Sequence, residues 1–273
     1  MIEFLEETPL REPLIFDTHA HYDDERFSDI PQLLKLLQNR GVGGVLTCGC
    51  DYQSSKEALA LATKYDYIHA GVGIHPGNID SGTTISQIEE LAKNKKCVCI
   101  GEIGLDYYWT QDNKEEQRVL FASQLELANK LDLPVSVHDR DAHADTLEIL
   151  KKHKPKGVIH SFSGSPEMAA EILKMGMYIG VGGVITFKNA RKLPEVVKMV
   201  PEERLLLETD APYLAPVPYR SKTNHSAMLY LVAEKIAEIR ETTTQHILEV
   251  TFKNAKRLFL NDGKAQALKP FLP

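Results

Sequence analysis

The sequence lacks several features that would assign it to a common class of protein. Its 273 residues carry a formal net charge of −6, so the chain has no positive field with which to coat nucleic acid, although a local phosphate site is compatible with that charge. No apolar run approaches the roughly 18 residues of a membrane-spanning helix. Residues 1–13 are acidic and lack the basic-then-apolar pattern of an export signal. We therefore expect a cytoplasmic chain that does not enter a membrane.

Motifs for nucleotide cofactors and for a serine nucleophile are also missing. The three G-x-G sequences, at Gly41, Gly71 and Gly180, have no third glycine at the dinucleotide-binding spacing, and no G-x4-G-K-[ST] occurs. The run His160-Ser161-Phe162-Ser163-Gly164 lacks the first glycine of the G-x-S-x-G elbow. We expect neither a nucleotide cofactor nor serine catalysis.

The four cysteines form two C-x-C pairs, Cys48/Cys50 and Cys97/Cys99. This spacing differs from the usual C-x2-C of zinc clusters. Both pairs lie in or at the end of apolar, strand-like runs, so we interpret them as buried free thiols.

What the sequence does contain, from residue 14 onward, is a regular alternation of short apolar runs and helical patterns. The clearest helix lies near Glu115–Leu131, where Phe121, Leu125 and Ala128 recur at three- and four-residue spacing. Another has clean ends, with Ser165 as N-cap and Gly176 as stop. The predicted strands are Leu14–Thr18, Gly44–Thr47, Tyr67–Ile74, Cys97–Glu102, Leu133–His138, Gly157–His160, Tyr178–Val181 and Arg204–Thr209.

Eight strand–helix units predict one α/β domain, a single (β/α)8 TIM barrel over residues 14–260 with an extra C-terminal helix. Residues 1–13 would form an N-terminal extension and residues 261–273 a C-terminal tail. A doubly wound open sheet is the alternative, and it would more often carry a Gly-rich dinucleotide turn.

Candidate metal ligands stand at the ends of five predicted strands. In an extended strand, residues i and i+2 point to the same face, so His19 and His21 would aim at one point. Because barrel enzymes build their sites at the carboxyl ends of the strands, ligands from different strands would meet there. The full set is His19, His21, Glu102, His138, His160 and Asp210.

Six such groups exceed what one tetrahedral ion takes, and they suit two divalent ions that share a carboxylate. The mixed nitrogen and oxygen donors fit Zn, Mn, Co or Ni, with Mg also acceptable. Glu208 shares a face with Asp210 and would either orient a ligand or serve as an ordinary structural carboxylate.

Further residues are candidates for substrate binding. His75 follows a predicted strand at the same mouth, and Arg140, Arg220 and Asn224 lie in segments able to bind a phosphate.

The sequence closely resembles the TatD family of metal-dependent deoxyribonucleases, which belong to the amidohydrolase-like barrels. The resemblance covers nearly all of residues 14–260. It is carried by the motifs Phe16-Asp17-Thr18-His19-Ala20-His21, Gly73-Ile74-His75-Pro76, Gly101-Glu102-Ile103-Gly104-Leu105-Asp106-Tyr107, His138-Asp139-Arg140-Asp141-Ala142, His160-Ser161-Phe162-Ser163-Gly164 and Glu208-Thr209-Asp210-Ala211-Pro212-Tyr213-Leu214.

The resemblance implies that His19, His21 and Asp210 hold one metal ion, that His138 and His160 hold the other, and that Glu102 bridges them. It also implies 3′→5′ exonuclease action on DNA, on a single strand or a 3′ end, through a water activated by two metals. As a mechanistic hypothesis of our own, Asp210 would orient or deprotonate that water and pass the proton to the leaving oxygen.

One segment departs from the family pattern. Family members commonly have Arg-Gly-Lys-Arg-Asn-Glu-Pro after the eighth strand, whereas Arg220–Ser226 reads Arg-Ser-Lys-Thr-Asn-His-Ser. The alternative function is hydrolysis of an amide, a lactone or another non-nucleic substrate at the same dinuclear site. A bridging lysine would favour that alternative, but the strand carries Glu102 instead.

Overall fold

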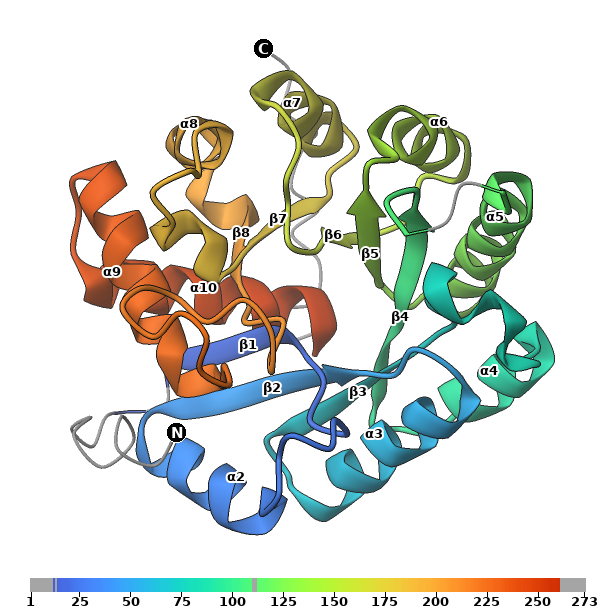
Figure 1. Cartoon of the computed structure of the whole chain (residues 1–273), viewed down its shortest axis with the longest axis horizontal. Helices are drawn as coiled ribbons and strands as arrows, with labels where there is room; N and C mark the ends of the chain where they lie inside the picture. The colour runs from blue at the N-terminus through green and yellow to red at the C-terminus, as the bar shows by residue number, and fades with distance from the viewer. Residues whose placement is uncertain (1–11, 13, 110–111, 261–273) are drawn as a thin grey trace.

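The computed structural model describes residues 12, 14–109 and 112–260 and contains a barrel of eight parallel strands in the order β1 to β8 (Figure 1). Each strand pairs with the next one along the chain, which confirms the predicted (β/α)8 barrel. The strands are β1 (Ile15–Ala20), β2 (Val42–Cys48), β3 (Ile68–Val72), β4 (Cys97–Asp106), β5 (Val135–Arg140), β6 (Gly157–Ile159), β7 (Tyr178–Val181) and β8 (Leu205–Leu207).

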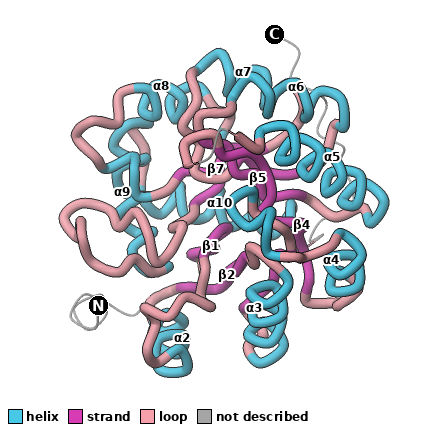
Figure 2. Tube along the Cα trace, turned by 45° about the vertical axis from the view of Figure 1, so that its right-hand side comes forward, coloured by secondary structure: helices cyan, strands magenta, loops and turns pink. Residues whose placement is uncertain are grey.

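Helices surround the strands as an outer layer (Figure 2). Their apolar faces and the outward-facing residues of the strands form the larger hydrophobic core. The predicted cap is present, since the Ser165 hydroxyl accepts a hydrogen bond from the Met168 N–H at the start of α7. The helices are α2 (Ile30–Asn39), α3 (Tyr52–Lys64), α4 (Ile85–Ala92), α5 (Lys114–Leu131), α6 (His143–His153), α7 (Pro166–Lys174), α8 (Lys192–Met199), α9 (Leu229–Arg240) and α10 (Thr244–Phe259).

The predicted extra C-terminal helix, α10, crosses behind the centre of the barrel in Figure 1. Its residues Ala255 and Phe259 belong to a second apolar cluster that also contains Phe16, Leu46 and Leu206 from the strands. This cluster fills the barrel interior on the side of α10.

A buried carboxylate joins the first and last strands of the barrel. The Asp17 side chain accepts hydrogen bonds from the Thr209 N–H at 2.9 Å and the Thr209 hydroxyl at 2.6 Å. It also accepts one from the Ser226 hydroxyl at 2.7 Å. Just beyond, a parallel bridge between Ala20 and Ala211 continues the contact. The barrel is therefore closed between β1 and the segment after β8 by side-chain hydrogen bonds as well as by backbone pairing. Predicted metal ligands stand on both sides of this closure.

The fourth strand is longer than predicted. It runs on from Glu102 to Asp106 because residues 103–106 pair with residues 137–140 of β5. A register shift between Ile100 and Ile103 precedes this pairing, and the alternation pattern alone does not reveal it.

Most of the predicted N-terminal extension and all of the predicted tail lie outside the described residues. Within the described residues, no helix combines the length and apolar character needed to cross a membrane.

The loop after β8 buries a histidine completely, and this predicts an acid-sensitive stability. Burial lowers the pKa of His225 from 6.5 to about 3. Between these values the unfolded chain binds more protons than the folded chain, so the free energy of unfolding falls as the pH drops below about 6.5. In the unsubstituted chain, His225 should lower the free energy of unfolding by about 2 kcal/mol between pH 7 and pH 5. We expect the His225→Leu variant to lack this part of the decrease.

Urea unfolding of both proteins at the two pH values, with chelator present throughout, measures this difference. The same loss of stability in the variant and in the unsubstituted chain would contradict the prediction.

Candidate metal centre

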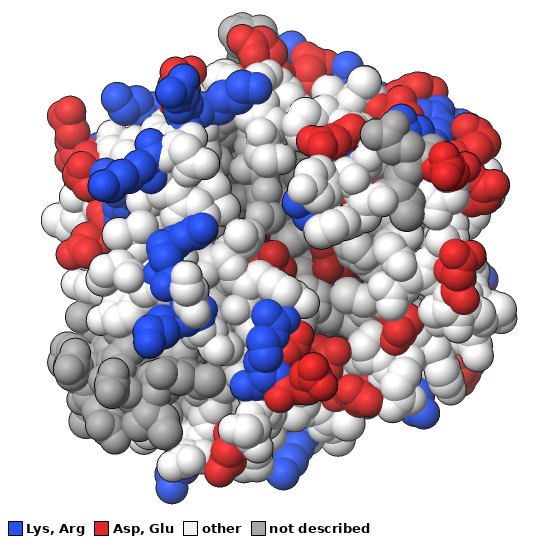
Figure 3. All heavy atoms as spheres, viewed as in Figure 1, with Lys and Arg blue, Asp and Glu red and all other residues white. Residues whose placement is uncertain are grey.

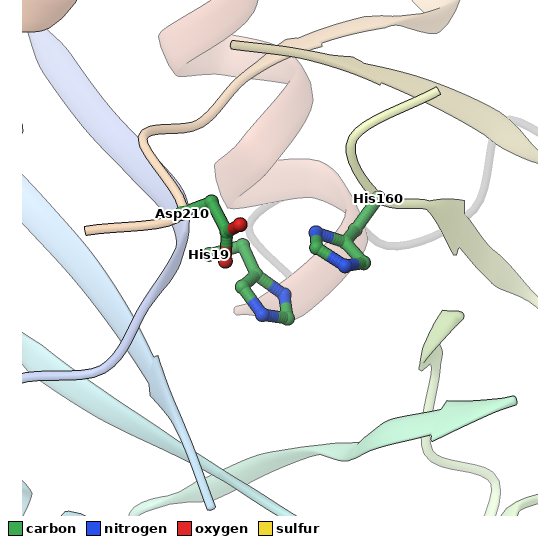
Figure 4. A group of neighbouring side chains, drawn as sticks. All are labelled: His19, His160 and Asp210. Carbon is green, nitrogen blue, oxygen red and sulfur yellow. The ribbon is translucent and has the colours of Figure 1, made fainter. Parts of the chain in front are cut away.

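The structure brings all six predicted metal ligands together at the carboxyl ends of the strands. Five of them line a cavity of about 730 Å³, and the sixth, His19, lies fully buried directly beneath. His19 lies in β1, Asp210 lies in the segment that follows β8, and His160 directly follows β6 (Figure 4). Figure 3 shows carboxylates within the hollow at the centre of the face that it views.

Glu102 occupies the middle of this group. One of its oxygens, Oε2, lies 3.3 Å from Nε2 of His19 and 3.4 Å from Nε2 of His21. The other, Oε1, lies 2.8 Å from Nδ1 of His138 and 2.9 Å from Nε2 of His160. The two oxygens of one carboxylate thus face two different pairs of histidines.

The donor atoms are arranged as cation sites require. The six predicted ligands form three overlapping groups, and within each group the donor atoms all lie within 4.8 Å of one another. Imidazole nitrogens and carboxylate oxygens are the donors that zinc and similar divalent ions accept. The residues therefore fit a divalent metal, and Glu102 belongs to two of the groups. The groups are His19 with His21 and Glu102, His19 with His160 and Asp210, and Glu102 with His138 and His160.

In His19 and in His21, the ring nitrogen that faces away from Glu102 contacts an uncharged group. Nδ1 of His19 lies 2.8 Å from the Ser136 hydroxyl. Nδ1 of His21 lies 2.9 Å from the carbonyl oxygen of Cys48, so this nitrogen donates and Nε2 presents its lone pair to the centre.

The outer nitrogen of His138 and of His160 faces a carboxylate. Nε2 of His138 is 3.0 Å from Oδ2 of Asp106, and Nδ1 of His160 is 3.5 Å from Oε1 of Glu208. Glu208 is fully buried and also accepts a hydrogen bond from the Ser161 N–H. Carboxylates behind ligand histidines fix the ring orientation and raise its basicity. The two halves of the centre therefore differ in electrostatic support.

The carboxylates of the centre and the histidines around them shift one another's pKa values. Burial raises the pKa of Glu102, but the neighbouring histidines His75, His160 and His19 and the hydrogen bond with His138 hold it well below its usual range. Burial lowers the pKa of His138, yet hydrogen bonds to Asp106 and Glu102 raise it above the ordinary value. The ionised carboxylates therefore make the electrostatic potential at this point negative, and a divalent cation bound by the neutral imidazoles would be stabilised by that potential in place of a proton.

His75 lies beside the centre in a defined tautomer. Its Nδ1 accepts a hydrogen bond from the Gly77 N–H at 2.9 Å, and burial lowers its pKa to about 4. The ring is therefore neutral with its proton on Nε2, which lies 3.6 Å from Oε1 of Glu102. Donor atoms of His75, Asp106 and His138 also lie within 4.8 Å of one another. The protonated Nε2 makes His75 a hydrogen-bond donor rather than a ligand there.

The predicted phosphate-binding residues are placed unequally. Arg140 lines the cavity. Arg220 instead lies over the ring of Phe187 at 3.7 Å and is not among the lining residues. Asn224 is fully buried, and its amide nitrogen donates to the carbonyl oxygens of Thr209 and Tyr213 at 2.9 and 2.8 Å. These bonds occupy both amide hydrogens, so Asn224 shapes the loop after β8.

Sequence reasoning missed two residues of the centre. The predicted strand ended at Glu102, so Asp106 lay beyond it. In the structure the strand continues to Asp106, and because Asp106 lies four residues after Glu102, both side chains point to the same face. Cys50 was expected to be a buried thiol like the other three, but it is only partly buried and lines the cavity. Its Sγ is 3.8 Å from Oε2 of Glu102. Burial raises its pKa to about 11, so it stays a thiol at neutral pH.

The barrel and the cluster of imidazoles and carboxylates at its mouth define a metal-dependent hydrolase. The chain belongs to the TatD family, because the family profile described as TatD related DNase matches residues 16–260.

Relatives and solved structures agree with this class. The chain is 40% identical over 252 residues to the metal-dependent hydrolase YabD of Bacillus subtilis, a match that covers 90% of this chain and 99% of the relative. It is 36% identical to the metal-dependent hydrolase YcfH of Escherichia coli, covering 91% and 97% of the two chains. The crystal structure of the TatD homologue YjjV of Escherichia coli superposes with a TM-score of 0.86 at 32% identity, covering 91% of this chain and 98% of that one.

The support from Asp106 predicts a measurable effect on metal affinity. Asp106→Asn keeps the shape of the side chain but removes the charge behind His138, so we expect metal affinity to fall about 10- to 100-fold. Competition with a chromophoric chelator measures this affinity without reference to turnover.

Asp145→Asn is the matched control, because Asp145 contacts Tyr107 and Arg118 rather than any of the six predicted ligands. An equal loss of affinity in both variants, or none in Asp106→Asn, would show that the carboxylate behind His138 does not support the metal.

Proposed function

We propose that this chain is a metal-dependent phosphodiesterase that removes nucleotides from the 3′ end of DNA. The observation that carries the proposal is the position of Glu102, whose two oxygens face two separate pairs of histidines. A carboxylate in that position suits a bridge between two ions, and paired ions are typical of enzymes that cleave phosphodiesters. The description of the family as TatD related DNase supports DNA as the substrate.

His19, His21 and Asp210 would hold one ion and His138 with His160 the other, with Glu102 shared. Two divalent ions at this position, such as Zn, Mn, Mg, Co or Ni, supply Lewis acidity, which lowers the pKa of water and neutralises charge on phosphoryl oxygens. The remaining chemistry falls to the side chains around them.

Asp210 is the proposed base. Burial raises its pKa, but the hydrogen bond with His21 and the nearby His160 lower it below the ordinary value, so the group is ionised at neutral pH. It lines the cavity, and its side chain keeps 20% of its exposure. An ionised carboxylate that remains accessible is suited to accept the proton of the attacking water and to return it to the departing oxygen.

His75 and Arg140 are the proposed contacts to the phosphate. The Nε2–H of His75 is a neutral donor at the edge of the centre, and it can donate to a phosphoryl oxygen without adding charge. Arg140 supplies a guanidinium whose planar fork matches phosphate oxygens.

The proposed reaction is tested by the products and by the direction of digestion. With metal added, the chain should release mononucleotides from single-stranded DNA whose 5′ end is blocked. It should spare the same strand when the 3′ end is blocked. Release from the 5′ end would contradict the direction, and hydrolysis of amides or lactones in preference to every phosphodiester would favour the alternative function.

Asp210→Asn tests the role of the base. We expect turnover to fall about 10²- to 10⁴-fold at matched metal content, because the amide cannot take up a proton. Asp139→Asn is the control, since Asp139 also lines the cavity but its oxygens contact His143 and Thr146. Unchanged turnover in Asp210→Asn with metal fully bound would exclude Asp210 as the base.

A further inference from the structure

Asp210 stands in a turn whose backbone conformation needs support from its surroundings. Its φ of 57° lies in the left-handed region, which residues other than glycine seldom adopt. Such a conformation persists where neighbouring groups determine it. The turn also sets the direction of the Asp210 side chain, whose Oδ1 lies 3.5 Å from Nε2 of His21. Whatever holds this turn therefore controls the position of a predicted metal ligand.

Every backbone N–H and carbonyl group of residues 209–211 takes part in a hydrogen bond. Two of these six bonds are closed within the turn, by the Thr209 hydroxyl and by the Tyr213 N–H. Three partners belong to β1 and the residue that follows it, namely Asp17, His19 and His21. The sixth group, the carbonyl oxygen of Thr209, accepts a hydrogen bond from a side chain at the other end of the loop after β8.

That side chain is Asn224, which is fully buried. Its amide nitrogen donates to the carbonyl oxygens of Thr209 at 2.9 Å and Tyr213 at 2.8 Å, on either side of Asp210 in the chain. Its backbone N–H donates to the carbonyl oxygen of Pro212 at 3.1 Å. Three hydrogen bonds from one residue thus join the two ends of the segment that contains Asp210.

Ser226 fastens the same part of the loop to the first strand. Its hydroxyl donates to Oδ2 of Asp17 at 2.7 Å, and its N–H donates to the hydroxyl oxygen of Tyr22 at 3.0 Å. The Asp17 carboxylate also accepts the hydrogen bond from the Thr209 N–H. A proline at this position, as in the common family sequence, has neither a hydroxyl nor an N–H. The serine therefore gives this chain two hydrogen bonds that a proline cannot form.

Neither Asn224 nor Ser226 is among the residues that line the cavity, so both act on the centre through the backbone. We propose that Asn224 and Ser226 are positioning residues, which hold the turn in the conformation that presents Asp210 to His21 and to the ion shared by these two residues. The inference rests on the proposed function for the role of Asp210 as ligand and base. It replaces phosphate binding as the role of Asn224.

Metal affinity tests this role without turnover. Competition between the full chain and a chromophoric chelator for Zn²⁺ resolves the binding of successive ions. Asn224→Leu keeps the size of the side chain but removes its donors, and it should weaken one ion about 10- to 100-fold, the loss expected when the support of a metal ligand is removed. The same ion should be weakened in Asp210→Asn, whereas the other ion should keep its affinity in both variants.

Asn254→Leu is the matched control. Asn254 is also a buried asparagine whose amide nitrogen donates to two carbonyl oxygens, those of Glu202 and Leu205 at 2.7 and 2.9 Å. These bonds lie at the amino end of β8, whereas the metal centre lies beyond its carboxyl end. Asn254→Leu should lower stability to urea but leave the affinity for both ions unchanged. An equal loss of metal affinity in the two leucine variants would overturn the positioning role.

A residue that acts through Asp210 has no further effect once that carboxylate is gone. Adding Asn224→Leu to Asp210→Asn should therefore weaken the metal no further, whereas independent roles would multiply the two losses. With DNA as substrate and metal saturating, Asn224→Leu should lower kcat at an unchanged KM. A raised KM with unchanged metal affinity would instead indicate contact with the substrate and would overturn the proposal.

Ser226→Ala is the milder variant, and it decides the question if Asn224→Leu does not fold. It removes one hydroxyl and should weaken the same ion about 2- to 10-fold. Unchanged metal affinity in the folded variants would exclude the positioning role. If such variants come from a chain that digests DNA, the proposed function stands without this inference. If the affinities change as expected but no phosphodiester is cleaved, the positioning role stands and the proposed function fails.

Discussion

Glu102 carries its carboxylate in a buried position among imidazoles, and the arrangement of the barrel mouth follows from the compensation that this charge requires. Glu102 is 4% exposed, and burying a charge without compensation is costly, so four histidine side chains must be delivered to its two oxygens from three different strands. Only a closed barrel brings those strand ends around one point. The pairing of β1 with the segment after β8 also places Asp210 beside His21 and so brings the sixth predicted ligand to the centre.

The surroundings of the six donors are built in two different ways. His19 and His21 rest on a hydroxyl and a backbone carbonyl, whereas His138 and His160 face the carboxylates of Asp106 and Glu208. Near His19 and His21, the additional carboxylate is that of Asp210, which itself faces the centre. Near His138 and His160, the additional carboxylates lie on the side of the imidazole rings away from the centre. The Asp106 carboxylate also holds the backbone of Tyr108 and Trp109. A single side chain therefore links ring orientation at the centre with the surface that lines its entrance.

Prediction from sequence succeeded where a local rule governs the outcome. Alternating apolar runs and helical stripes identify strands and helices without knowledge of their neighbours, and the carboxyl ends of parallel strands share one face of a barrel, so His138 and His160 could be placed together from their positions alone. Prediction failed where pairing changed the local rule. After a register shift, β4 continues to pair with β5 as far as Asp106. In the loop after β8, the Asn224 amide is bound to two backbone carbonyl oxygens and cannot contact a phosphate.

The barrel and the types of donor could be read from the amino-acid sequence, because periodicity and residue chemistry are properties of the chain read in order. Which atom of each donor faces which partner became clear only from the folded barrel. The neutral tautomer of His75 follows from a hydrogen bond to Gly77, and the two faces of Glu102 follow from the meeting of β1, β5 and β6. Such contacts join residues far apart in the chain, and their geometry exists only after the barrel has closed.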